Sequence, residues 1–297
     1  MRSNWVRATL KSPSASKRLS LRFFKQTPFS LLLFVSIGVL CTSEVMALDP
    51  AKEASGPCPS GSYLAGRDTP WVPTPDVLVE AMLDLVELTP QDYVIDLGSG
   101  DGRMVIAAAR RGASGHGIEY NPAMVECANW RAEQAGVTDQ IRFLHGDMFT
   151  TDISKATVLP LFLLEENLHQ LMPTFLALKP GTRIATNNFE IPGWQDVKSL
   201  TLSEDCGHWC TAYLWIVPAR IGGVWKLDGA GELVITQEFQ RISGTLSSKD
   251  GTQKVTGQMN GERITFMAGD NEYIGTVKDD KMTGQGTSGT WSATRTE

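Results

Sequence analysis

Residues 93–102 constrain the fold of this 297-residue chain more than any other stretch. They begin as a short apolar strand, Tyr93–Leu97, and then turn through alternating glycines into a helical pattern that starts at Arg103. Glycine has no Cβ and tolerates positive φ, so a ligand can approach the backbone of such a turn closely. We therefore predict that a ligand binds over the glycine loop, which we define as Gly98–Gly102.

Two aspartates indicate the charge of that ligand. Asp96 stands at the end of the strand and Asp101 lies inside the turn. Carboxylates repel the phosphates of a nucleotide, whereas they attract a sulfonium or an amino group. The glycine loop therefore predicts a cationic cofactor, S-adenosylmethionine, rather than a dinucleotide.

The spacing of the glycines also argues against two common nucleotide motifs. The dinucleotide fingerprint has a glycine three residues after its second glycine, where this chain has Arg103. A phosphate-binding loop needs Gly-Lys-Ser/Thr, which the glycine loop lacks.

Strand and helix patterns alternate around the glycine loop, and this predicts an α/β fold with a Rossmann-like parallel sheet covered by helices on both faces. Thr74 is the predicted N-cap of the first helix, with Pro75 as its first residue, and Pro173 is expected to bend or split the last helix. The predicted helices cover residues 75–88, 104–111, 122–135 and 167–178. The predicted strands cover residues 93–97, 116–120, 140–145, 156–164 and 182–187, with a closing pair at 196–203 and 211–218.

The pattern changes after Gly222. Apolar and polar residues then alternate in short segments separated by turn residues such as Asn260-Gly261 and Asp279-Asp280. This predicts a small antiparallel β module of about five or six strands, either a meander or a half-open barrel.

Further acidic residues end the next two predicted strands. In a doubly wound sheet the ligand lies over the carboxyl ends of the strands. Glu119 ends the second strand, where it can accept both ribose hydroxyls, and Asp147 follows the third strand, where it can bind the adenine amino group. Each acid taken alone has a structural alternative, as a turn cap or a surface residue; together they favour a cofactor site. The predicted cofactor-binding residues are Asp96, Gly98, Ser99, Gly100, Asp101, Gly102, Glu119, Tyr120, Asp147 and Met148.

These motifs resemble the cofactor motifs of class I S-adenosylmethionine-dependent methyltransferases. Two further segments, the Trp-Val-Pro-Thr-Pro sequence at 71–75 and the strand at 156–164, narrow the resemblance to one group within this class. These segments are similar to those of a group that contains the mitochondrial lysine methyltransferases of the ADP/ATP translocase and of the ATP synthase c subunit, with bacterial relatives. The resemblance covers about residues 69–220. It implies a seven-stranded sheet and methyl transfer from S-adenosylmethionine to a lysine amine.

Such a transfer is an in-line displacement by a neutral amine. Free lysine has a pKa near ~10.4, so the site must favour the uncharged amine by desolvation or let water take the proton. The chain lacks an Asn/Asp-Pro-Pro-Tyr/Phe motif, which argues against an amide or a base nitrogen as acceptor. The residues expected near the methyl group, none with a matched catalytic role, are Trp71, Thr74, Glu165, Asn187 and Asn188. Two alternatives stay open: a small-molecule methyltransferase with the β module as a lid, and an exported non-catalytic protein that retains the fold.

The first 47 residues differ in composition from the rest. They hold seven Lys/Arg and one acid, Glu44, followed by an apolar run and a small-residue site at Ala47, as in a secretory signal peptide. An exported or periplasmic protein is therefore expected. The alternatives are an uncleaved anchor that associates with a membrane through residues 28–43, a mitochondrial presequence, and a cytosolic protein that starts at Met46. The expected divisions are a leader at 1–47, a linker at 48–67, a methyltransferase domain at 68–220 and the β module at 221–297.

Charge and cysteine content limit the partners. After residue 47 the chain has 20 basic and 32 acidic residues, which argues against nucleic acid and leaves a protein lysine or a small molecule as the acceptor. Four cysteines remain there, too few for a disulfide scaffold. Cys206, His208 and Cys210 fall short of a tetrahedral metal set, so no metal is predicted, and a disulfide or free thiols stay open for the two cysteines.

Overall fold

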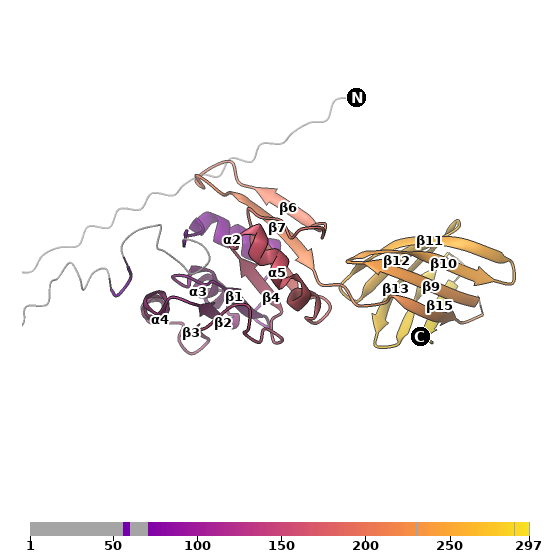
Figure 1. Cartoon of the computed structure of the whole chain (residues 1–297), viewed down its shortest axis with the longest axis horizontal. Helices are drawn as coiled ribbons and strands as arrows, with labels where there is room; N and C mark the ends of the chain where they lie inside the picture. Colours follow the sequence, from indigo (N-terminus) through magenta and orange to yellow (C-terminus); the bar gives the residue numbers. More distant parts are fainter. Residues whose placement is uncertain (1–55, 60–70, 230, 288, 297) are drawn as a thin grey trace, which may run out of the picture. The chain divides into compact units, whose positions relative to one another are not determined.

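The structure is a computed structural model, and it describes residues 56–59, 71–229, 231–287 and 289–296 (Figure 1). The predicted leader, its residues 28–43, its cleavage site and most of the predicted linker lie outside these residues. Within the described part of the chain, no helix is long and apolar enough to cross a membrane.

The first half of the described chain alternates helices with strands. The helices are α2 (Asp76–Leu85), α3 (Arg103–Arg110), α4 (Pro122–Ala135) and α5 (Glu165–Leu176). The strands are β1 (Tyr93–Leu97), β2 (Ser114–Glu119), β3 (Ile141–His145), β4 (Val158–Leu161), β5 (Arg183–Asn187), β6 (Lys198–Thr201) and β7 (Thr211–Ile216).

These strands form one seven-stranded sheet in the order β3-β2-β1-β4-β5-β7-β6. Strands β1 to β5 pair in parallel, and β7 is antiparallel to both β5 and β6. The order reverses between β1 and β4, and the crevice at such a switch point is where open α/β sheets bind ligands. The predicted Rossmann-like seven-stranded sheet is confirmed.

Alternate side chains of the central strands explain why helices cover both faces. Val94 packs in a cluster with Leu78 of α2, whereas its neighbour Ile95 packs in another cluster with Phe175 of α5. Successive residues of a strand point to opposite faces, so an apolar run such as Val94-Ile95 needs a helix on each side. The sheet is therefore the common wall of two cores.

One local prediction about a helix end differs from the structure. Helix α2 begins at Asp76, with Pro75 at the N-cap position and no side-chain cap, so the predicted Thr74 cap is wrong. The Thr74 hydroxyl instead accepts a hydrogen bond from Nδ2 of Asn187 at 3.3 Å. Of the two outcomes predicted for Pro173, the split does not occur, because α5 continues through it from Glu165 to Leu176.

Residues 223–295 form a closed antiparallel barrel. Each strand pairs with the next, and β15 pairs with β8 to close the ring. Its strands are β8 (Gly223–Leu227), β9 (Gly231–Glu238), β10 (Arg241–Ser248), β11 (Gly251–Asn260), β12 (Arg263–Ala268), β13 (Asn271–Lys278), β14 (Lys281–Gly286) and β15 (Gly289–Arg295). The predicted β module is confirmed, but its five or six strands and half-open barrel are wrong.

The missed strands have a local cause. The hairpin of β9 and β10 turns at Phe239-Gln240, which carries none of the usual turn residues and resembles part of one long alternating strand. Phe239 adopts a φ of 53°, which a sequence pattern does not reveal for an aromatic residue.

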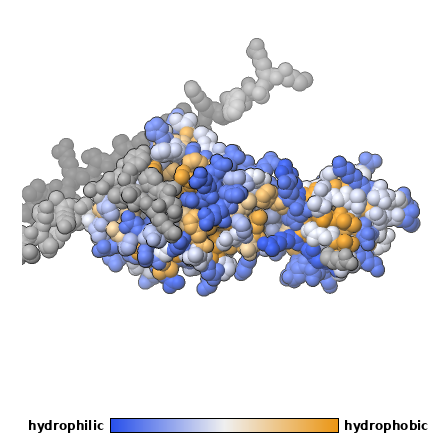
Figure 2. Space-filling view, viewed as in Figure 1, coloured by the Kyte–Doolittle hydropathy of each residue, from blue (hydrophilic) through white to orange (hydrophobic). Residues whose placement is uncertain are grey.

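Side chains fill the barrel interior. One buried cluster includes Trp225, Phe266 and Trp291 and draws on all eight strands. Gly275 makes room for this packing, because a Cβ there would lie 2.7 Å from the Trp291 ring and 2.4 Å from the Thr283 carbonyl oxygen. On the face shown in Figure 2, hydrophilic residues cover most of the surface, with smaller apolar patches between them.

All four described cysteines form disulfides, Cys58–Cys127 and Cys206–Cys210. The first ties residues 56–59 to α4, where Gly56 lies so close to Trp130 that a Cβ would be 2.5 Å from its ring. The second closes a short loop between β6 and β7.

We predict unequal contributions of the two disulfides to stability. Cys58 and Cys127 are 69 residues apart, and a bond that closes a loop of this length removes chain entropy worth about 4 kcal/mol from the unfolded state. Cys206 and Cys210 are 4 residues apart, and their bond is worth about 2 kcal/mol. Urea unfolding of the two Cys→Ser double variants, without reductant, measures both losses. A larger loss for the Cys206/Cys210 variant would contradict the loop-entropy argument.

Candidate active site

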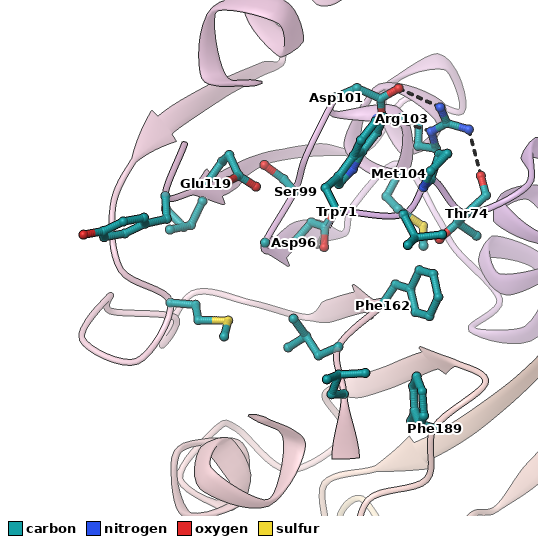
Figure 3. A pocket seen from close by; sticks show the side chains of 18 of the residues that line it. Trp71, Thr74, Asp96, Ser99, Asp101, Arg103, Met104, Glu119, Phe162 and Phe189 are labelled. Carbon is teal, nitrogen blue, oxygen red and sulfur yellow. Dashed lines mark hydrogen bonds and ion pairs between the residues drawn. The ribbon is translucent and has the colours of Figure 1, made fainter. Parts of the chain in front are cut away.

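A cavity of about 430 Å³ opens at the switch point of the sheet, within the size range of small-molecule sites (Figure 3). Its walls come from the glycine loop after β1 and from the segments that follow β2, β3 and β4. Residues 71–74, which precede α2, and Phe189 and Trp209, which flank the β5–β7 pair, complete it. The cavity therefore lies where a doubly wound sheet binds its ligand.

The glycine loop has the backbone that its sequence predicts. Gly98, Gly100 and Gly102 have φ values of 74°, 52° and 79°. A Cβ on Gly100 would lie 2.0 Å from Nε1 of Trp71, so the indole rests directly on the loop (Figure 3). The glycines thus allow both the turn and the close approach of a flat group.

The Glu119 carboxylate joins two strand ends. Its Oε2 accepts a hydrogen bond from the Gly100 backbone N–H at 2.9 Å, and its Oε1 accepts one from the Asn121 N–H at 2.8 Å. Carboxylate oxygens have further lone pairs, so Glu119 can also accept from ligand hydroxyls in the cavity that it lines.

Asp96 is a buried carboxylate of the cavity with a strongly perturbed pKa. Its side chain is buried, 4% exposed, and it lines the cavity. Burial raises the pKa of the Asp96 carboxyl well above its usual range, and the charge of Glu119 raises it further. A cation in the cavity offsets both causes, so this carboxyl is placed to bind a positive group.

Asp101 has a different role from Asp96. Its carboxylate pairs with Arg103 at 2.7 Å and also with Arg131. Arg103 in addition donates to the Thr74 carbonyl oxygen at 2.8 Å, so it ties the glycine loop to residues 71–75 (Figure 3). The sequence did not reveal this bridge, because it depends on residues nearly 30 positions apart.

The remaining predicted cofactor residues also gather at the cavity, where Tyr120, Asp147 and Met148 line its wall. Ser99 is buried, and its hydroxyl has no hydrogen-bond partner among the described residues. In Figure 3 it lies beside Glu119. An unpartnered buried hydroxyl in a cavity wall fits a site that receives a polar ligand.

The residues predicted near the methyl group separate into two sets. Trp71 and Thr74 line the cavity, and Asn187 is fully buried behind them on Thr74. Glu165 and Asn188 are not among the described residues that line the cavity. Glu165 is exposed at the start of α5, and the Asn188 N–H donates to the Thr211 carbonyl oxygen at 2.7 Å.

An apolar wall completes the cavity on the side of β4, β5 and β7. It consists of Phe162, Leu163, Leu164, Phe189 and Trp209. Sequence reasoning missed it, because Phe162 resembles strand core and the other two aromatic residues stand in loops. Only the order of the strands brings these loops to one edge.

No group of three or more His, Cys, Asp or Glu side chains in the described residues is arranged to hold a metal ion. The sulfur atoms of Cys206 and Cys210 are joined to each other. The cavity thus combines carboxylates at one end with apolar side chains at the other. Chemically, it can bind a cationic, hydroxyl-bearing molecule beside an apolar one.

Comparison with known proteins finds relatives for part of the chain. Residues 96–198 match the family model of the ANTKMT methyltransferase domain. A protein-lysine N-methyltransferase of Saccharolobus islandicus is 38% identical over 151 residues, 50% of this chain and 93% of the archaeal protein. The lysine N-methyltransferase of the ATP synthase c subunit from Xenopus laevis is 32% identical over 126 residues.

The coverage differs between these relatives. The alignment with the frog protein covers 42% of this chain and 55% of the frog protein, so the chain spans about half of that relative. A solved RNA methyltransferase from Salinibacter ruber, in complex with S-adenosyl-L-homocysteine, is 43% identical and covers 50% of this chain and 96% of its own, with a TM-score of 0.48.

We predict that binding of S-adenosylmethionine weakens as the pH falls through the raised pKa of Asp96. A cation favours the ionised carboxylate, so binding below that pKa must release the proton that free Asp96 holds. Isothermal titration in two buffers of different ionisation enthalpy measures the released proton.

The Asp96→Asn variant should bind at least tenfold more weakly and lose this proton release. Asp139→Asn removes the same charge from an exposed position that does not line the cavity, and it should bind as the unmodified chain does. Equal proton release by the Asp96→Asn variant would assign the titration to another group.

Proposed function

Since the chain belongs to the class I S-adenosylmethionine-dependent methyltransferases, in the family of the ADP/ATP translocase and ATP synthase c-subunit lysine methyltransferases, we propose that it methylates a protein lysine. The observation that carries this proposal is the cavity itself, whose carboxylate end continues into an apolar wall. The carboxylate end suits the cationic cofactor, and the apolar wall suits an uncharged alkyl amine.

The cofactor supplies a methyl group on a positively charged sulfur when it is bound. At the carboxylate end, Glu119 would accept hydrogen bonds from the ribose hydroxyls, and Asp147 would accept one from the adenine amino group. The Asp96 carboxylate would offset the positive charge of the cofactor. Trp71 lies on the glycine loop, and the bridge from Arg103 to Thr74 holds this part of the cavity wall in place.

The acceptor end acts by position and desolvation. Apolar side chains at this end, among them Leu163 and Leu164, exclude water from an amine and so remove the hydration that its charged form needs. The described cavity wall has no histidine or lysine that could serve as a general base, and its carboxylates lie at the cofactor end. The amine therefore enters uncharged or loses its proton to water, and its placement supplies most of the rate.

We predict that tritium from labelled S-adenosylmethionine enters protein when residues 48–297 are incubated with a cell lysate. Acetylating the lysate lysines beforehand should abolish the incorporation, because an acetylated amine is not a nucleophile. The Asp96→Ala variant should lower the incorporation at least tenfold, since the cofactor loses its buried counter-charge.

The fraction that carries the label distinguishes the alternatives. Label in small solutes would support a small-molecule methyltransferase, and label in RNA would contradict the lysine proposal. An absence of label, together with an absence of cofactor binding, would support a non-catalytic protein that retains the fold.

We also propose that the chain is exported through its first 47 residues. The two disulfides support this, because disulfides persist in oxidising compartments and are rare in the cytosol. The basic and apolar composition of residues 1–47 supports it as well. S-adenosylmethionine is made in the cytoplasm, so an exported enzyme depends on donor that reaches it.

We predict that the natural protein begins at Leu48 and that its four remaining cysteines resist a maleimide reagent until dithiothreitol is added. N-terminal sequencing and mass spectrometry of the protein from cell fractions measure both. A start at Met46 with reactive thiols would place the protein in the cytosol and refute the export proposal.

A further inference from the structure

Three aromatic side chains of the cavity come from neighbouring strand ends. Phe162 follows β4, Phe189 follows β5, and Trp209 precedes β7, and these strands are adjacent in the order β4-β5-β7. Strand β7 is antiparallel to β5, so its first residues lie at the same sheet edge as the end of β5, where Asn187 pairs with Ala212. The sheet topology therefore assembles the three rings.

The rings contact one another around Phe162. Its centroid lies 6.4 Å from that of Phe189, with the planes 23° apart, and 6.2 Å from that of Trp209, with the planes 54° apart. All three side chains line the cavity. Trp209 is 37% exposed, although burial of an indole is favourable. Its open face is therefore available to a further group.

This end of the cavity differs in charge from the cofactor end. The acids that line the cavity lie at or just after the carboxyl ends of β1, β2 and β3; they are Asp96, Asp101, Glu119 and Asp147. Figure 3 shows Phe162 and Phe189 away from Glu119 and below Thr74 and Met104. The faces of aromatic rings attract alkylammonium groups through cation–π interaction and pack against methylene chains. Their chemistry thus fits an aliphatic amine and its methylated forms better than an anionic acceptor.

The loop of Trp209 is fixed by the Cys206–Cys210 disulfide. Cys206 is buried in the core cluster that contains Ala212 and Leu214 of β7, and the Cys210 carbonyl oxygen accepts a hydrogen bond from the Leu202 N–H at 2.9 Å. Between the two cysteines, Trp209 adopts a φ of 58°, which is unfavourable for a residue with a side chain. A cross-link on both sides of this residue restricts the loop to few conformations.

We propose that Phe162, Phe189 and Trp209 form the subsite that binds the lysine side chain and its methylated ammonium group, and that the Cys206–Cys210 disulfide positions Trp209 in it. This inference rests on the proposed function, because it names the groups that would recognise the lysine. Trp209 binds the acceptor, whereas the disulfide acts through Trp209.

The aromatic subsite is tested by binding, independently of turnover. With S-adenosylhomocysteine present, NMR titration compares a trimethyl-lysine peptide with the same peptide that carries the uncharged tert-butyl isostere. We expect the cationic peptide to bind at least fivefold more tightly. The Trp209→Ala variant should remove this preference and Trp209→Phe should retain part of it, while His169→Ala, which changes an exposed ring of α5 outside the cavity wall, should leave it unchanged. Equal affinity of the two peptides for the unmodified chain would overturn the subsite.

The positioning role of the disulfide is tested by kinetics. In the Cys206→Ser/Cys210→Ser variant, we expect the lysate concentration for half-maximal methylation to rise about fivefold, with an unchanged maximal rate and unchanged cofactor affinity. Dithiothreitol supplies two electrons and two protons and converts the disulfide into two thiols. It should reproduce this effect in the unmodified chain and in the Cys58→Ser/Cys127→Ser variant, but not in the Cys206→Ser/Cys210→Ser variant.

Circular dichroism verifies that each variant is folded. The role of the disulfide would be overturned if the folded Cys206→Ser/Cys210→Ser variant reached half-maximal methylation at the same lysate concentration as the unmodified chain. It would also be overturned if this variant lost cofactor binding. If the unmodified chain binds no S-adenosylmethionine, the proposed function itself fails, and that outcome is separate from the comparison of the two peptides.

Discussion

The cavity depends on one carboxylate that connects the end of β2 to the loop after β1. Glu119 holds the Gly100 N–H with one oxygen and the Asn121 N–H with the other, so a single side chain orders the glycine loop and the start of α4. Its charge also raises the pKa of the Asp96 carboxyl. Geometry and electrostatics of the cofactor end are therefore coupled, and a change at Glu119 affects both.

The two ends of the cavity carry out complementary tasks. Carboxylates at the ends of β1 to β3 stabilise positive charge, and apolar side chains beyond β4 and β5 exclude water. In the proposed transfer to an amine, positive charge would move from sulfur to nitrogen, so the acceptor end would have to accommodate a cation after the reaction. Aromatic faces do so without the strong hydration that a carboxylate brings. The cavity is therefore polar where the positive charge would start, on sulfur, and aromatic where it would end, on nitrogen.

The sequence predicted those features that local chemistry determines. The glycine loop and the alternation of helices and strands each depend on residues close together in the chain. The Arg103–Thr74 bridge, the Cys58–Cys127 disulfide and the aromatic wall depend on contacts between residues far apart, and no local pattern specifies them. Thr74 was assigned to a helix cap because its neighbours are typical of one, but Asn187, 113 residues away, takes its hydroxyl. The turn at Phe239 was not predicted, because its residues are typical of a strand although Phe239 has a positive φ.

The closure of the barrel has a consequence for the order in which the chain folds. Strand β8 pairs with β15, and the Arg295 guanidinium lies 4.4 Å from the centroid of the Trp225 ring. These contacts join residues about 70 positions apart, so neither edge is covered until β15 has been synthesised. The methyltransferase sheet, by contrast, is complete at Ile216. During synthesis the sheet can therefore fold while the barrel is still an open set of strands with an unpaired edge, which is the state most exposed to pairing with another chain.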